Sequence, residues 1–277
     1  VAAARILGAK EVALIGALGQ DDIARQQIAA LQAEGVITAG IQQIAGEESG
    51  QAYILIDQTG QNVIASHLGA NARLSREHLN KAQVEQQLQE CRGIVLSDPN
   101  LEVAEELIKL AKRRGVPVLW DPGILISPNS EALLSLVKDA KVLFLNETEA
   151  SALLGTDELE ASLQRLQKLG FGNHTVLKLG AQGAVMLEPV SDKVTEVPAL
   201  PLNRLGLNVV NTVGCGDVFA GVFAAYYVTG SSLEQSLIMA STAGGLNASR
   251  PETRGSPDRA ALEATEQQFR NLDFTVQ

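Results

Sequence analysis

The chain has few cysteines and histidines. Only Cys91 and Cys215 occur in 277 residues, far apart and without CxxC spacing. A disulfide framework or a zinc knuckle needs closely grouped cysteines, so neither is supported, and a reducing cytosol is the simplest setting. The three histidines, His67, His78 and His174, also lack the spacing of metal ligands, and we expect them to be structural or solvated.

Long apolar runs and clustered basic charge are missing as well. No stretch is long enough to cross a bilayer, and nothing resembles a signal peptide, so we expect a soluble, cytoplasmic protein without a membrane partner. The net charge of −10 comes from 22 basic and 32 acidic residues, with no long run of either sign. Nucleic acid is not expected as a partner, because a phosphate backbone requires a clustered basic face.

Strand and helix signals alternate along the chain, of which 45% is apolar, and predict a single α/β domain over residues 1–277. Short buried runs predict strands, and longer amphipathic runs predict helices. The stretch from 188 to 208 is less regular. The predicted strands are 11–16, 93–97, 118–121, 142–145, 175–179 and 184–187; the predicted helices are 1–7, 23–34, 75–90, 101–114, 130–137, 148–154, 159–169, 218–228, 233–246 and 258–269.

Polar residues follow several of these strands. Asp98, Asp121 and Asn146 each stand at the carboxyl end of a predicted strand. Ligands of doubly wound sheets bind at that edge. We therefore expect the functional site there.

The rhythm changes over about 36–70, where three short β runs, 41–44, 51–57 and 62–67, predict a small antiparallel element outside the main sheet. A turn is expected at 57–60. Residues 52–56 are apolar on both faces, so one face can cover a substrate while the other meets a partner subunit. The alternative is that both faces pack on the core of the domain.

The segment Asn211-Thr212-Val213-Gly214-Cys215-Gly216-Asp217 precedes an apolar helical run. Its glycines and the helix start can direct backbone N–H groups into one small space, which forms an anion site. The sequence has no Walker loop, and the third glycine of a dinucleotide fingerprint is missing, since position 219 is Phe. The alternative is that Asp217 only caps the helix.

Asp217 is the candidate catalytic base of this segment. We expect it to remain ionised, because the helix dipole and hydrogen bonds favour the carboxylate. An ionised acid beside an anion site can accept the proton of an attacking hydroxyl. Gly221, one turn further on, should let the helix pack closely against a neighbour and bring its N-terminus inward.

Two other segments could hold a nucleotide. Asn146 and Glu149 lie three residues apart at a strand-to-helix junction and offer oxygens to a hydrated cation such as magnesium. The alternative is a capped helix start. Residues 178–183, Lys-Leu-Gly-Ala-Gln-Gly, join two strands and could cradle a ribose or adenine, although such a glycine hairpin also occurs without a ligand.

Together these motifs resemble the ribokinase (PfkB) family of carbohydrate kinases. The resemblance is carried by Asn-Thr-x-Gly-x-Gly-Asp at 211–217, Asn-Glu-Thr-Glu at 146–149, Lys-Leu-Gly-x-x-Gly at 178–183, and an early stretch comprising 49–50, 60–64 and 69–71. It runs through nearly the whole chain. The signature around Asp217 is specific, and the other motifs are individually weaker.

The resemblance implies a three-layer, doubly wound and mostly parallel sheet with a small β lid, and often a homodimer joined through the lids. It implies transfer of the ATP γ-phosphate to a primary hydroxyl, with ribose as the first candidate acceptor and ribose 5-phosphate as the product. Asp217 would be the base and would touch the sugar, Asp98 would also bind the sugar, and Glu149 would organise magnesium through water. Gly214, Cys215 and Gly216 would form the anion hole, and the ATP contacts would be Asn146, Lys178, Leu179, Gly180, Ala181, Gln182, Gly183 and Ser241.

A potassium site is also implied beside the anion hole, with the candidate ligands Asn211, Val213, Asn247, Arg250, Glu252 and Ser256. Asn211 stands where many members have Asp, so the lost charge should weaken monovalent-cation binding. Asp98 replaces a longer Glu, and Ser241 a usual Asn. The family's N-terminal sugar-binding segment would precede Val1, and we expect the sequence to be incomplete there. Other acceptors, such as fructose, 2-keto-3-deoxygluconate or a nucleoside, and a non-catalytic binding protein remain alternatives.

Overall fold

The computed structural model describes residues 1–56, 62–123, 131–171, 173–189, 191 and 193–270. The turn expected at 57–60 and the first residue of the helix expected at 130–137 lie outside these ranges. In the described residues, six strands form the main sheet in the order β10-β9-β8-β7-β6-β5. They are β5 (Ile94–Ser97), β6 (Val118–Asp121), β7 (Val142–Asn146), β8 (His174–Lys178), β9 (Ala184–Leu187) and β10 (Val194–Val197).

Strands β5 to β8 run parallel, while β9 and β10 are antiparallel to their neighbours. This mixed, mostly parallel sheet confirms the α/β fold class. Strand β10 lies in the stretch that the sequence marked as less regular. Its residues Val194–Val197 alternate between partly exposed and buried positions, and one half-buried strand of four residues gives only a weak pattern.

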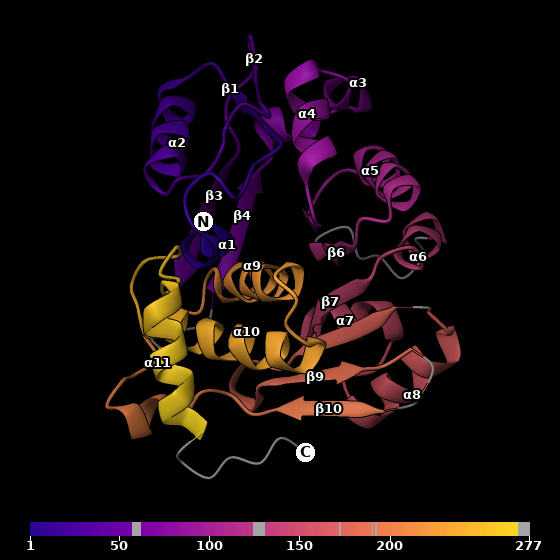
Figure 1. The fold of residues 1–277 in the computed structure, drawn as a ribbon, viewed down its shortest axis with the longest axis vertical. Coiled ribbons are helices and arrows are strands. Elements are labelled where there is room, and N and C mark those ends of the chain that lie inside the picture. Colours follow the sequence, from indigo (N-terminus) through magenta and orange to yellow (C-terminus); the bar gives the residue numbers. More distant parts are fainter. Residues whose placement is uncertain (57–61, 124–130, 172, 190, 192, 271–277) are drawn as a thin grey trace.

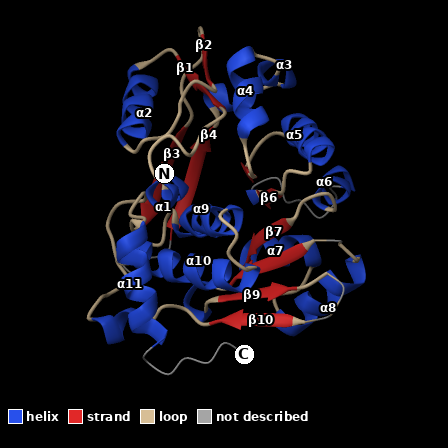
Figure 2. Ribbon diagram, viewed as in Figure 1, coloured by secondary structure: helices blue, strands red, loops and turns tan. Residues whose placement is uncertain are grey.

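Helices cover both faces of the sheet, which produces three layers (Figures 1 and 2). On one face, Trp120, Leu143 and Leu177 pack against helices α3 to α8. On the other, Phe144 and Met186 pack against α9 and α10. The helices are α1 (Ala2–Leu7), α2 (Asp22–Ala33), α3 (Arg76–Leu79), α4 (Ala82–Glu90), α5 (Leu101–Arg114), α6 (Glu131–Val137), α7 (Glu147–Leu154), α8 (Leu159–Leu169), α9 (Cys215–Val228), α10 (Leu233–Ala248) and α11 (Arg259–Arg270).

Two predictions in the first third of the chain are wrong. The strand expected at 11–16 is instead β1 (Gly16–Gly19), and of the earlier residues only Ala13 forms a bridge, with Ile37. The run at 41–44 is β2 (Ile41–Ile44), which pairs in parallel with β1 rather than joining the antiparallel element. Helix α2 connects the two strands, and such a crossover is what a parallel pair requires. Four residues with two glutamines carry no signal for which partner they choose.

The helix expected at 75–90 is divided into α3 and α4. Asn80 ends α3, and Lys81 has an extended backbone with φ −73° and ψ 138° before α4 begins. Asn is a poor helix former because its side chain competes for backbone hydrogen bonds. The amphipathic pattern continues across the break, and so the pattern alone did not reveal it.

Strands β3 (Gln51–Ile56) and β4 (Asn62–His67) form an antiparallel hairpin that pairs with no other strand in the described residues. The side chains of Tyr53, Leu55, Val63 and Ile64 are exposed, with Leu55 75% accessible. The alternative in which both faces of this segment pack on the core is therefore excluded. The hairpin is a two-stranded sheet of its own, separate from the six-stranded sheet (Figure 1).

No helix within the described ranges has both the length and the hydropathy that crossing a bilayer would require.

Candidate active site

Four neighbouring strands each bring a polar residue to the same edge of the sheet. Asp121, Asn146 and Lys178 are the last residues of β6, β7 and β8, and Asp98 directly follows β5. Ser97 pairs with Asp121 and Asn146 pairs with Lys178 in the parallel register, so the four positions lie side by side. The sequence predicted this gathering for Asp98, Asp121 and Asn146.

An ion pair crosses this edge. Lys178 Nζ donates to Asp121 Oδ2 at 2.5 Å, although β7 lies between their two strands. Both side chains are largely buried, at 13% and 14% exposure. Lys178 Nζ also lies 3.4 Å from the point where a Cβ on Gly216 would stand. The lysine therefore connects the sheet edge to the start of α9.

The start of α9 is shaped by glycine. Gly214 is its N-cap, with φ 82°, and a Cβ there would lie 2.2 Å from the carbonyl oxygen of Thr253. Such a φ and such a contact suit glycine alone. Gly221 faces α1, where a Cβ would stand 3.2 Å from Ala2 Cβ, which confirms the expected close packing of this helix.

Backbone N–H groups of the first turn of α9 can hold an anion. The Cys215 N–H donates to the Thr212 carbonyl at 3.3 Å, a bond at the long end of the normal range. Gly216 and Asp217 follow in the first turn, whose N–H groups have no partner four residues back inside the helix. The positive end of the helix dipole adds to this attraction.

Asp217 sits in that first turn. Burial raises the pKa of its carboxyl, the nearby charge of Asp121 raises it further, and Lys178 lowers it. The sequence pointed to the helix dipole and hydrogen bonds as influences that favour the carboxylate, whereas the largest influence on this pKa is burial. That Asp217 remains ionised stays a prediction. A carboxylate whose pKa is raised above the ordinary value of 3.8 is a stronger base, which suits proton removal from an alcohol.

Asn146 and Glu149 form a capping box at the start of α7. Asn146 Oδ1 accepts from the Glu149 backbone N at 2.8 Å, and Glu149 Oε2 accepts from the Asn146 backbone N at 2.7 Å. Asn146 Nδ2 donates to Glu149 Oε1 at 2.8 Å. Burial raises the pKa of Glu149, and Asp121 and Asp98 add to the effect. The capped helix start is thus present, and it faces the same acidic cluster.

The turn at 178–183 contains a short 3₁₀ segment, Gly180–Gln182, between antiparallel β8 and β9. Gly183 has φ 101°, and a Cβ there would lie 2.1 Å from the Val197 carbonyl oxygen. Ser241, on α10, is buried, and its Oγ donates to the Pro198 carbonyl at 3.3 Å. The turn and Ser241 therefore meet the same segment after β10. The remaining predicted ATP contacts of the turn are Leu179, Ala181 and Gln182, of which the last two belong to the 3₁₀ segment.

Asp98 has a left-handed backbone, with φ 46°, which is uncommon for a residue other than glycine. Its carboxylate lies against Gly123, where a Cβ would stand 2.0 Å from Asp98 Oδ1. The Asp98 N–H donates to the Asp121 carbonyl at 3.3 Å. Backbone strain of this kind is typical of functional positions.

The predicted potassium ligands have other partners. Asn211 Oδ1 accepts from the Val213 N–H at 3.0 Å, and Asn211 Nδ2 donates to the Pro251 carbonyl at 3.0 Å. Asn247 is fully buried, and its backbone carbonyl accepts from the Arg250 N–H at 3.0 Å, while its Oδ1 has no hydrogen-bond partner among the described residues. The Glu252 carbonyl accepts from the Gly255 N–H at 3.1 Å.

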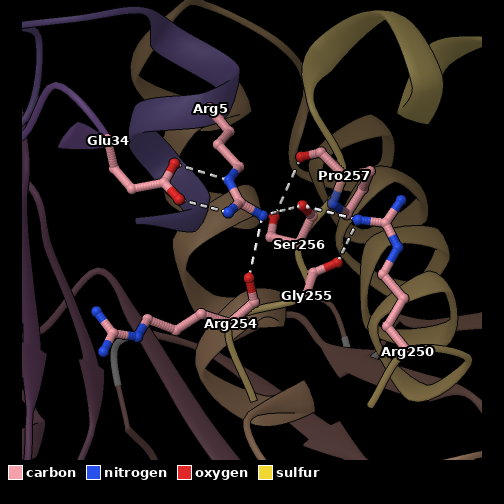
Figure 3. Close-up of polar contacts among 7 residues, drawn as sticks. All are labelled: Arg5, Glu34, Arg250, Arg254, Gly255, Ser256 and Pro257. Atoms are coloured by element: carbon pink, nitrogen blue, oxygen red, sulfur yellow. Dashed lines mark hydrogen bonds and ion pairs between the residues drawn. The ribbon is translucent and has the colours of Figure 1, made fainter. Parts of the chain in front are cut away.

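The guanidinium groups of Arg5 and Arg250 donate hydrogen bonds to the backbone carbonyls of residues 254–256 (Figure 3). Arg5 Nη1 donates to the Ser256 carbonyl at 2.5 Å and to the Arg254 carbonyl at 3.0 Å, while Glu34 holds the other side of Arg5. Arg250 Nη1 donates to the carbonyls of Gly255 at 2.6 Å and Ser256 at 3.2 Å. Positive charge is therefore built into this loop.

Sequence reasoning missed three contributors. Asp121 was seen only as a strand end, Asn247 only as a backbone ligand, and Arg5 not at all. A buried-strand pattern ending in Asp121-Pro122-Gly123 was the available signal for the first. Arg5 is 249 and 251 residues from its acceptors, and Asn247 is 34 and 32 residues from its partners, so only the tertiary structure brings them together. No group of three His, Cys, Asp or Glu side chains within the described ranges could hold a metal ion by itself.

Residues 1–260 match the family described as pfkB family carbohydrate kinase. The chain belongs to this family. The chain is therefore a phosphotransferase that acts on sugar hydroxyls. This match confirms the family resemblance and the enzyme class predicted from the motifs.

Individual relatives agree with this assignment. A deoxyribokinase of Salmonella typhi is 30% identical over 243 residues, which cover 86% of this chain and 74% of that protein. The solved structure of Arabidopsis thaliana ribokinase complexed with ribose and ATP is 25% identical, with a TM-score of 0.81 over 99% of this chain and 85% of that chain. A putative ribokinase II of E. coli, solved with ATP and Mg²⁺, has 21% identity and a TM-score of 0.79 over 96% and 86% of the two chains.

Proposed function

We propose that this protein transfers the γ-phosphate of ATP to a primary hydroxyl of a sugar, with ribose as the preferred acceptor and ribose 5-phosphate as the product. One observation carries the proposal: a carboxylate, Asp217, stands in the first turn of α9, where helix N–H groups and Lys178 converge. A base beside an anion site is what an alcohol-to-phosphorus transfer requires.

In this proposal Asp217 removes the proton as the sugar oxygen attacks the γ-phosphorus, and the bond to the ADP oxygen breaks. The N–H groups of Gly216 and Asp217, together with Gly214 and Cys215, stabilise the charge on the transferring phosphoryl. Asp98 contacts the sugar. Asn146, Ser241 and the 178–183 turn hold the nucleotide.

Magnesium fits the site as a companion of the nucleotide. Glu149 has a raised pKa among Asp121 and Asp98, so a cation brought in on the ATP phosphates relieves their repulsion. Its contact with Glu149 would run through water, because both Glu149 oxygens are already bonded to Asn146. Bound magnesium would neutralise phosphate charge during transfer.

A potassium ion fits less well. The Asn211 amide offers an N–H₂ group to the Pro251 carbonyl where an Asp would offer a second oxygen. The Ser256 carbonyl already accepts from two guanidinium groups. We infer that phosphoryl transfer by this chain does not depend on a monovalent cation.

The hairpin of β3 and β4 supports a homodimer. Leu55 pairs with Val63 across the hairpin, Tyr53 lies on the same face as Leu55, and all three are exposed. A contiguous apolar surface of this kind is typical of an interaction site. The opposite face of the hairpin would cover the bound sugar. A cytoplasmic location and a single domain complete the proposal.

The alternatives are a kinase for fructose, 2-keto-3-deoxygluconate or a nucleoside, and a binding protein without activity. The experiment is ATP consumption with a panel containing ribose, deoxyribose and these acceptors, followed by NMR identification of the product. Phosphorylation of the primary hydroxyl of ribose with the highest kcat/KM is expected. A higher kcat/KM for another acceptor would replace ribose, and ATP binding without consumption on any acceptor would overturn the kinase proposal.

A further inference from the structure

The ion pair between Asp121 and Lys178 has a geometry that packing alone does not explain. Lys178 ends β8 and Asp121 ends β6, two strands apart in the sheet, or about 9–10 Å at the usual strand spacing. The lysine side chain reaches across the end of β7 to close a contact of 2.5 Å. Holding a lysine in one direction restricts a flexible four-carbon stem.

The direction matters because of what lies beside the ammonium. Lys178 Nζ stands 3.4 Å from the Cβ position of Gly216, in the first turn of α9. A Cβ at 216 would be in van der Waals contact with the ammonium, whereas glycine leaves the space between them open. An ammonium has three N–H donors, and Asp121 accepts one of them. The others remain available for an oxygen bound at the first turn of α9.

Among the described residues, the charged side chains other than Lys178 that act on Glu149 and Asp217 are carboxylates. The charge of Asp121 raises the pKa of both Glu149 and Asp217, and the charge of Asp98 also raises that of Glu149. Lys178 is the positive side chain that lowers the pKa of both groups. Without a fixed cation, a phosphoryl group would meet mainly carboxylates. An unrestrained Lys178 could instead pair with Asp217 and neutralise the base.

We propose that Asp121 is a positioning residue that holds the Lys178 ammonium toward the phosphoryl group bound at Gly216 and keeps it away from Asp217. This inference rests on the proposed function, and it adds a residue and a division of labour to it. Lys178 supplies charge to the transferring phosphoryl group, while Asp121 acts only through Lys178 and touches neither substrate.

The test is a double-mutant cycle with Asp121→Ala and Lys178→Met, measured as kcat and KM on the best acceptor of the panel. Lys178→Met should lower kcat by about 10²–10³-fold, as loss of a charge-stabilising donor does. Asp121→Ala should lower kcat by about 10- to 100-fold with little change in the sugar KM, and Asp121→Asn, which keeps an acceptor oxygen, should recover most of the loss.

The decisive outcome is the double variant. If Asp121 works through Lys178, then Asp121→Ala costs nothing further once Lys178 is Met. The proposal would be overturned if the fold losses in kcat of the two single variants multiply in the double variant. It would also be overturned if Asp121→Ala leaves kcat unchanged. The exposed pair Lys112 and Asp139 meets at 2.6 Å and precedes β6 and β7, whereas the site lies at the carboxyl ends of these strands, so Lys112→Met and Asp139→Ala are matched controls.

A binding measurement separates this inference from the kinase proposal. Calorimetry of MgATP and MgADP should show that wild type prefers the triphosphate and that Lys178→Met and Asp121→Ala each reduce that preference. Should wild type phosphorylate no acceptor, the kinase proposal fails while this ratio still tests the role of Asp121. An ATP-to-ADP affinity ratio that neither variant changes would overturn the inference, even for a folded and active enzyme.

Discussion

Lys178 Nζ lies 2.5 Å from Asp121 Oδ2, and the pair bridges two strands that are not neighbours in the sheet. This contact ties the carboxyl edge of the sheet to the glycine loop before α9. It also places one positive charge among the carboxylates of Asp217 and Glu149. The geometry of the proposed phosphoryl site depends on this relationship.

Replacing the proposed base should abolish phosphorylation. Asp217→Asn removes the proton acceptor but keeps the size of the side chain, so we expect kcat to fall by roughly 10²–10⁴-fold. Nucleotide affinity should remain within a few-fold of wild type. Steady-state kinetics and ATP calorimetry measure the two effects, with the exposed Asp157→Asn as the control. Near-normal turnover in Asp217→Asn would remove the base assignment.

The same substitution should stabilise the fold at neutral pH. Burial raises the pKa of Asp217 in the folded state above its ordinary value of 3.8. The folded protein therefore binds the proton more tightly than the unfolded chain, so the contribution of Asp217 becomes less favourable as pH rises between the two pKa values. Above the folded-state pKa that penalty is fully present, and Asp217→Asn removes it. Thermal unfolding should show a higher Tm than wild type at pH 7 and a smaller gain near pH 3.

The pH dependence of kcat/KM should also reflect the raised pKa of Asp217. Because Asp217 must be deprotonated to act, kcat/KM should fall at acid pH with an apparent pKa above 3.8. The carboxylate of Asp121 contributes to that raised pKa, so Asp121→Asn should move the acid limb to lower pH. A limb at the same pH in both enzymes would contradict the electrostatic coupling between the two residues.

Potassium should have little effect on the wild-type enzyme. We expect less than a two-fold change in kcat when tetramethylammonium replaces potassium, because amide and guanidinium groups already occupy the candidate ligands. Asn211→Asp restores a carboxylate and should introduce stimulation by potassium. A second readout is Tm, which potassium should raise in Asn211→Asp alone. Strong activation of wild type by potassium would contradict the inferred independence.

The exposed hairpin should mediate association. Leu55→Lys with Val63→Lys places two charges at facing positions of β3 and β4 and should convert a dimer to a monomer in light scattering. Val209→Lys, at a position 65% exposed outside the hairpin, is the matched control and should leave the mass unchanged. A wild-type protein that is monomeric at all concentrations would rule out the interface.

The sequence determined the class of the fold and the centre of the site. Buried runs of four or five residues alternating with amphipathic helices specify a mostly parallel sheet, since period and length are local properties. Helix 101–114 and helix 159–169 match the structure at both ends. The Gly-x-Gly-Asp segment at the start of α9 could be predicted in the same way, because the φ of Gly214 and the cap position depend on neighbouring residues.

Tertiary structure alone decided the pairings and the charges. The choice of β1 as the partner of β2 depends on how α2 packs, and the two glutamines of β2 do not encode it. The direction of the Asp217 pKa depends on burial and on Asp121, which is 96 positions away in the chain. Arg5 meets the carbonyl of Ser256 only because α1 packs beside α9. Contacts between distant segments carry no periodic signal, so their electrostatic consequences appear only once the chain is folded.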